Sequence, residues 1–163
     1  MLTPGDDAPD FELLGSEGDA IRQYRLSPAL SSGAAVLAFY LFDFHPACTE
    51  QVCDIRDLKW FDIADDISVY GISTDSAFSH RAFASETSLD FPLLSDSDGS
   101  VATAYGVLEP ELAGHRAIPQ RSVFVVDDAQ TVRYAWAADD PSQLPDWVAV
   151  QEAIDSLLSP RRP

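Results

Sequence analysis

Residues 39–57 read Phe-Tyr-Leu-Phe-Asp-Phe-His-Pro-Ala-Cys-Thr-Glu-Gln-Val-Cys-Asp-Ile-Arg-Asp and contain both cysteines of the chain, Cys48 and Cys53. The apolar run 34–40 leads into this stretch and predicts a strand that is buried on both faces. Pro46 predicts the start of a helix, because its fixed φ is already helical and its missing N–H would be unpaired in the first turn. The stretch therefore predicts a strand, a short aromatic loop and a helix with Cys48 in its first turn.

A cysteine in the first turn of a helix is a candidate nucleophile. The unpaired backbone N–H groups and the positive end of the helix dipole favour the thiolate, which is the nucleophilic form. The alternative is a buried, inert cysteine, but His45, Pro46 and the second thiol favour a reactive site. A metal site formed by His45, Cys48 and Cys53 is a third interpretation, although it lacks an evident fourth ligand.

The stretch resembles the peroxiredoxins of the alkyl hydroperoxide reductase/thiol-specific antioxidant family. Their peroxide-reducing cysteine ends a Pro-x-x-x-Thr-x-x-Cys motif that follows an aromatic pair, and residues 39–40 are such a pair. Cys48 matches the family cysteine, whereas Leu41 stands at the proline position and His45 at the threonine position. The spacing to Cys53 resembles the bacterioferritin-comigratory-protein (Q-type) branch, in which a resolving cysteine lies five residues on.

Later segments also resemble the family, in the same order: residues 73–80, 91–96, 104–107 and 121–127. The resemblance implies an α/β, thioredoxin-like fold with a central mixed β-sheet flanked by helices and an N-terminal β-hairpin extension. It covers most of the chain, so we expect one domain over residues 1–163.

The resemblance also implies a thiol-dependent peroxidase for hydrogen peroxide and organic hydroperoxides. Cys48 would attack the peroxide and become a sulfenic acid, and Cys53 would resolve it to an intramolecular disulfide. A thioredoxin-like partner would then reduce the disulfide without any cofactor. Arg121 aligns with the family arginine at the start of a strand, where its permanent charge would hold the thiolate and bind a peroxide oxygen.

The loop before Cys48 contains the departures from the family pattern. An imidazole at position 45 can donate a hydrogen bond as threonine does, and a protonated one would add positive charge. His45 is therefore a working substitute, a sign of an altered substrate pocket, or a sign of a degraded site, and Leu41 adds to that question. The backbone N–H of Ala47 is expected to bind peroxide. Tyr40 and Phe44 either line the pocket or pack in the core.

Two other functions remain open. A thioredoxin-like disulfide exchanger is one, although that class uses Cys-x-x-Cys, which is absent here. A redox-sensing module that has lost turnover through the changes at Leu41 and His45 is the other. Within the family both homodimers and monomers occur, so a homodimer is an open expectation.

The charge of the chain is strongly acidic. With 27 acidic and 10 basic residues in 163, the formal net charge is −17. Such a surface repels nucleic acid and anionic membranes, so we expect neither as a partner. Because the acids are spread along the chain, adaptation to a very salty cytoplasm explains them better than a dedicated acidic interaction surface.

The N-terminus and the hydropathy favour a cytoplasmic location. The first residues carry acid where a secretory signal needs basic residues and an apolar core. The longest apolar run, residues 34–42, is far shorter than the roughly 18 residues that a membrane span needs.

Periodicity predicts the remaining elements. A helix over 46–64 and a strand over 67–72 would form a β-α-β unit with parallel strands. Residues 96–99 (Asp-Ser-Asp-Gly) are predicted to form a turn and helix cap rather than a calcium loop, because no ligating glutamate follows at the required spacing. The others are hairpins 11–14/20–24 (turn at 15–18) and 121–126/131–137, a helix from Asp75 or Ser76 to Thr87 with Phe78, Ala82 and Phe83 on one side, and an amphipathic helix over 145–158.

Overall fold

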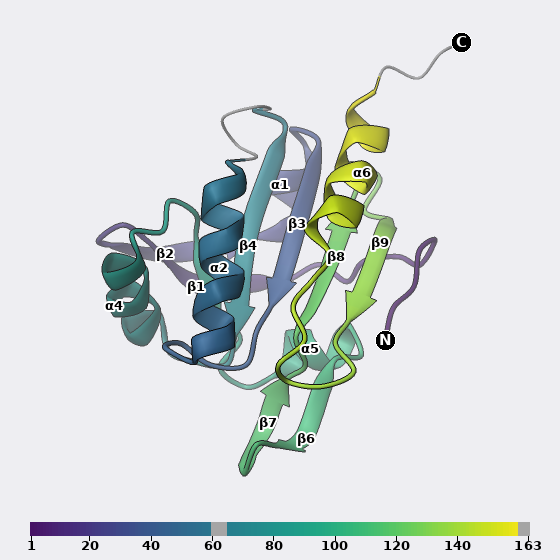
Figure 1. The fold of residues 1–163 in the computed structure, drawn as a ribbon. Coiled ribbons are helices and arrows are strands. Elements are labelled where there is room, and N and C mark those ends of the chain that lie inside the picture. The colour runs from purple at the N-terminus through teal and green to yellow at the C-terminus, as the bar shows by residue number, and fades with distance from the viewer. Residues whose placement is uncertain (60–64, 160–163) are drawn as a thin grey trace.

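The computed structural model describes residues 1–59 and 65–159. A seven-stranded mixed sheet runs through the molecule in the order β2-β1-β5-β4-β3-β8-β9 (Figure 1). Its strands are β1 (Glu12–Glu17), β2 (Ala20–Arg25), β3 (Ala34–Phe39), β4 (Ile67–Ser73), β5 (Leu93–Ser95), β8 (Ser122–Val126) and β9 (Val132–Ala137). A separate two-stranded sheet pairs β6 (Leu108–Leu112) with β7 (His115–Pro119).

Helices cover both faces of the large sheet. They are α1 (Leu26–Leu30), α2 (Pro46–Leu58), α4 (Ala77–Thr87), α5 (Ser100–Ala104) and α6 (Trp147–Leu158). In Figure 1, α2 and α6 lie in front of the sheet and α1 lies behind it. Within the described ranges no helix combines the length and the apolar character that crossing a membrane requires.

Strand β3 lies in the interior of the sheet, between β4 and β8, and is covered on both faces. All six of its residues are buried, and it pairs in parallel with β4 and antiparallel with β8. Side chains alternate along a strand, so Val36 and Ala38 pack in the core under α2 and α6, while Leu37 and Phe39 pack in the core on the α1 and α5 face. This arrangement confirms the predicted thioredoxin-like architecture and the β-α-β unit.

Helix α2 begins at Pro46, as predicted, with proline in its first turn. It ends at Leu58 because Lys59 adopts a left-handed conformation with φ of 49°. The predicted continuation to residue 64 is thus interrupted at Lys59, and residues 60–64 lie outside the described part of the chain. Val52 and Ile55 face the core.

Helix α4 is capped as predicted, since the Ser76 hydroxyl accepts the backbone N–H of Ser79. The predicted shared side for Phe78 and Phe83 is wrong: Phe83 is buried, whereas Phe78 is 66% exposed. Five residues at 100° per residue place the two rings about 140° apart around the helix. Ala82 is also exposed. The inward face consists of Ala77, His80, Phe83 and Ala84.

Both predicted hairpins form, with one shift. β1 continues to Glu17, so the turn to β2 lies at Gly18 and Asp19 rather than at 15–18. The β8–β9 hairpin forms as predicted. The β6–β7 hairpin was not predicted; its two-residue turn uses Ala113 and Gly114 with φ of 52° and 78°, which suits the tight turns that match strand twist.

Residues 96–99 form the predicted turn and helix cap. The buried carboxylate of Asp96 accepts the backbone N–H groups of Val101 and Ala102 at 3.1 and 2.8 Å. These are among the unpaired donors at the start of α5, so the acidic residue serves the helix end.

Candidate active site

Cys48 is the third residue of α2 and lies in its first turn, at the carboxyl end of β3. The prediction for this position is confirmed. Its side chain is buried, that of Cys53 is half-buried, and both thiols are free. The helix is regular through both cysteines, so they lie on different sides of α2.

Arg121 donates through Nη1 to the Sγ atom of Cys48 at 3.4 Å. Antiparallel pairing places it there: Ser122 of β8 lies opposite Phe39 of β3, so Arg121 reaches the end of β3 where α2 begins. Its Nη2 donates to the Pro141 carbonyl at 2.8 Å, and the residue is only 1% exposed. A guanidinium is always charged, so a permanent positive charge lies against the sulfur of Cys48.

Gln51 orients that guanidinium and was missed by the sequence reasoning. It lies three residues after Cys48, fully buried, on the same side of α2. Its Oε1 accepts from Arg121 Nη1 at 2.5 Å, and its Nε2 donates to the Phe39 carbonyl at 3.4 Å. A polar residue on the buried face of a helix was the available signal, because such a group needs a partner.

His45 is the N-cap residue of α2, but its imidazole makes no capping hydrogen bond. Its carbonyl accepts the N–H and the hydroxyl of Thr49 at 2.8 and 3.0 Å. Within the described residues, Nδ1 of His45 is buried without a hydrogen-bond partner. Burial, and then the charge of Arg121, lower the pKa of His45. The ring is therefore neutral at pH 7 and does not supply the positive charge that a protonated histidine would.

Leu41, which stands at the family proline position, lines a small cavity beside Arg121. Leu41 is buried and, with Arg121, Gln120 and Pro141, borders a cavity of about 60 Å³. Cys48 is not among its lining residues. A change at position 41 thus acts on the surroundings of Arg121.

The three predicted substrate-binding residues have different surroundings. Ala47 is half-buried in the first turn of α2. Tyr40 is fully buried and its hydroxyl donates to Asp43 at 2.6 Å. Phe44 is 49% exposed, and its ring lies 5.1 Å from that of Phe83, centroid to centroid. Their roles toward substrate stay predictions.

The structure does not group His45, Cys48 and Cys53 as a possible metal site. In the part of the chain that it describes, the grouping suited to a metal is Asp43, Asp75 and His80, whose ligand atoms lie within 4.8 Å of one another. Each of these three side chains already has hydrogen-bond partners.

Comparison with known proteins agrees with this geometry. Residues 4–135 match the model of the AhpC/TSA family. The chain belongs to this family, the peroxiredoxins. A Mycobacterium tuberculosis protein named as a peroxiredoxin is 39% identical over 131 residues, covering 80% of this chain and 82% of its own. The chloroplastic peroxiredoxin Q of Sedum lineare is 36% identical over 135 residues, covering 83% of this chain and 69% of its own.

Solved structures place this peroxiredoxin in the same branch. The crystal structure of peroxidoxin BcpB from Mycobacterium tuberculosis aligns with a TM-score of 0.79 and 33% identity, covering 99% of this chain and 100% of its own. The predicted likeness to the bacterioferritin-comigratory-protein (Q-type) branch is confirmed. The peroxiredoxin is accordingly an oxidoreductase of the peroxidase class.

Proposed function

We propose that this peroxiredoxin reduces hydrogen peroxide and organic hydroperoxides with Cys48 as the peroxidatic cysteine and Cys53 as the resolving cysteine. The observation that carries the proposal is the 3.4 Å contact between Arg121 Nη1 and Cys48 Sγ in the first turn of α2. It combines a nucleophile, a permanent positive charge and the N–H groups of a helix start at one place.

In the first step the Cys48 thiolate attacks one oxygen of the peroxide. The S–O bond forms as the O–O bond breaks, Cys48 becomes a sulfenic acid, and the second oxygen leaves as water or an alcohol after taking up a proton. Negative charge develops on the leaving oxygen, which backbone N–H groups at Ala47 and Cys48 stabilise. The buried Nε–H of Arg121, unpartnered among the described residues, is a further donor for it.

In the second step the Cys53 thiol attacks the sulfenic acid, forming a disulfide and releasing water. Residues five apart in a regular helix have Cα atoms about 8.6 Å apart. A disulfide tolerates only about 4.4–6.8 Å. The first turns of α2 therefore unwind before the bond forms, which is least costly at a helix end, where few hydrogen bonds are lost.

In the last step a thioredoxin-like dithiol reduces the disulfide by thiol exchange and α2 refolds. The electrons come from that dithiol, so the chain's own residues need no bound cofactor. The half-buried position of Cys53 suits it to become accessible when the helix opens.

The test is hydrogen peroxide consumption with a thioredoxin system, measured for the wild type beside Cys48→Ser and Cys53→Ser. We expect turnover by the wild type and none by Cys48→Ser. Disulfide exchange without peroxide consumption would instead indicate a thioredoxin-like exchanger. The absence of both activities would indicate a redox-sensing module.

A further inference from the structure

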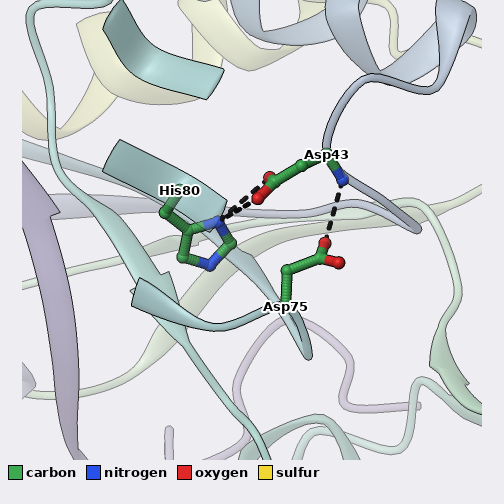
Figure 2. Close-up of side chains that lie close together, drawn as sticks. All are labelled: Asp43, Asp75 and His80. Atoms are coloured by element: carbon green, nitrogen blue, oxygen red, sulfur yellow. Dashed lines mark hydrogen bonds and ion pairs between the residues drawn. The ribbon is translucent and has the colours of Figure 1, made fainter. Parts of the chain in front are cut away.

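A buried polar cluster holds the loop that precedes Cys48, and the reaction as proposed does not use it. Figure 2 shows Asp43 from the loop, His80 from the first turn of α4 and Asp75 from the segment between β4 and α4. The side chains of Asp43 and His80 are 1% and 0% exposed. Together with Tyr40 and Ser79, which also bond Asp43, these residues are called here the Asp43 anchor.

The carboxylate of Asp43 accepts hydrogen bonds on both oxygens. Oδ1 accepts from the Tyr40 hydroxyl at 2.6 Å, and Oδ2 accepts from the Ser79 hydroxyl at 2.7 Å. Burial and the nearby charge of Asp43 raise the pKa of Tyr40, so the phenol keeps the proton that it donates.

Both ring nitrogens of His80 have hydrogen-bond partners. Nε2 lies 3.0 Å from the Leu94 carbonyl, which can only accept, so this nitrogen carries a proton. Nδ1 lies 2.8 and 3.0 Å from the two oxygens of Asp43 and 3.2 Å from the Tyr40 hydroxyl. The imidazole therefore joins Asp43 of the loop to the backbone of β5.

A second carboxylate, that of Asp75, also holds the loop. Asp75 accepts the backbone N–H of Asp43 at 2.9 Å and the hydroxyl of Ser73 at 2.7 Å. Its carboxylate therefore lies beside that of Asp43.

The anchor acts on the loop before α2, where local backbone hydrogen bonding is weak. Between Asp43 and α2 the chain passes through Phe44, whose φ of 67° is left-handed and unusual for a residue with a side chain. His45 follows as the N-cap residue. Its backbone N–H donates a long hydrogen bond to the Phe42 carbonyl, with an N···O distance of 3.4 Å. The anchor holds this loop from the α4 side, and Arg121 holds Cys48 from the β8 side.

We infer that Asp43 and His80 form a hydrogen-bonded positioning pair that keeps the loop and the first turn of α2 in the peroxide-reactive conformation. The inference rests on the proposed function. The pair touches neither cysteine, so it acts through the loop. Loss of the pair therefore slows the attack of Cys48 on peroxide but not disulfide formation, since the second step needs the first turn to open.

The first test uses the wild-type protein and NMR. We expect the ring N–H of His80 at Nε2 to give a signal that is protected from solvent exchange, because it donates to the Leu94 carbonyl. Rapid exchange of this proton with solvent would overturn the pairing. This readout does not depend on peroxide chemistry or on any variant folding.

The second test compares Asp43→Asn with Asp127→Asn. Asp127 is a matched control: a buried carboxylate paired with Arg133, at the opposite end of the sheet. We expect Asp43→Asn to slow Cys48 oxidation at least tenfold in stopped-flow measurements and to leave the disulfide step at least as fast. Backbone amide exchange at position 43 and at Thr49 should become faster. Asp127→Asn should change none of these. Ser79→Ala is a milder variant should Asp43→Asn not fold, with smaller changes in the same directions.

Equal effects of the two aspartate variants, or no effect of Asp43→Asn and Ser79→Ala, would overturn the positioning role. A wild type that does not react with peroxide would overturn the proposed function instead. The NMR and amide-exchange measurements would still decide whether the pair holds the loop.

Discussion

Arg121 and Cys48 lie 73 residues apart in the chain, yet Nη1 of the arginine is 3.4 Å from Sγ of the cysteine in a buried site. Gln51 shares the same Nη1, and the Pro141 carbonyl accepts from Nη2. The guanidinium is thus held by three partners and is aimed at the sulfur before any substrate arrives, which lowers the reorganisation that the reaction requires.

Substitution of Arg121 tests that contact. We expect Arg121→Gln to slow both alkylation of Cys48 and its oxidation by peroxide at least tenfold, about 1.4 kcal/mol of barrier, because the thiolate loses its charged donor. Arg121→Lys keeps the charge without the planar fork and should be intermediate. Arg133→Gln, which removes an arginine far from the cysteine, should leave both rates unchanged. Unchanged rates in Arg121→Gln would remove this residue from the site.

The side chain at position 45 distinguishes a hydrogen-bonding role from packing. If the imidazole replaces the family hydroxyl, His45→Thr should keep peroxide turnover. His45→Ala should lose roughly a hundredfold or more, the range typical of a lost catalytic hydrogen bond. The measurement is kcat/KM for hydrogen peroxide in all three proteins. Equal values would assign His45 to packing.

The titration of His45 follows from its surroundings. Burial and the Arg121 charge lower its pKa below the ordinary 6.5, so we expect an NMR midpoint under that value and a shift back toward it in Arg121→Gln. The unfolded chain then binds more protons below pH 6.5, so this group lowers stability as the pH falls through that range. His45→Thr should lack this contribution. A midpoint at or above 6.5 would contradict the arrangement.

Disulfide formation requires α2 to open, since it is helical through both cysteines. After one equivalent of peroxide, mass spectrometry should show that the wild type loses two hydrogens and that Cys53→Ser gains one oxygen. Circular dichroism should show a loss of roughly two helical turns in the oxidised wild type, by the spacing of the two residues. A wild type that gains oxygen while Cys53 stays free would point to a one-cysteine enzyme resolved by an external thiol.

Salt should stabilise the protein strongly because its formal charge is −17. The Debye length shortens from about 10 Å at 0.1 M salt to about 3 Å at 1 M, which screens repulsion among the acidic side chains. We expect the melting temperature to rise steeply across that range of KCl. A flat or falling melting temperature would exclude adaptation to high salt.

Local chemistry was enough to predict much of the fold. The apolar run of β3, the proline that opens α2 and the serine cap of α4 act within a few residues, so the sequence indicates them directly. The same local reasoning placed Cys48 in the first turn of a helix. It failed for Phe78, where the helical angle decides the exposed face, and for the β6–β7 hairpin, whose turn depends on positive φ at Ala113 as well as Gly114.

The partners of buried polar groups were decided only in the tertiary structure. The register between β3 and β8 brings Arg121 to the cysteine, and the parallel pairing of β3 with β4 brings the loop with Asp43 to His80. Periodicity can show that a residue faces inward. The hydrogen-bond partner of a buried donor or acceptor, however, is whichever group the packing of distant elements places within about 3 Å. The sequence alone therefore indicated Cys48 and its helix, and the family resemblance pointed to Arg121. The position of the guanidinium against the sulfur and the partners of Asp43 depend on strand register.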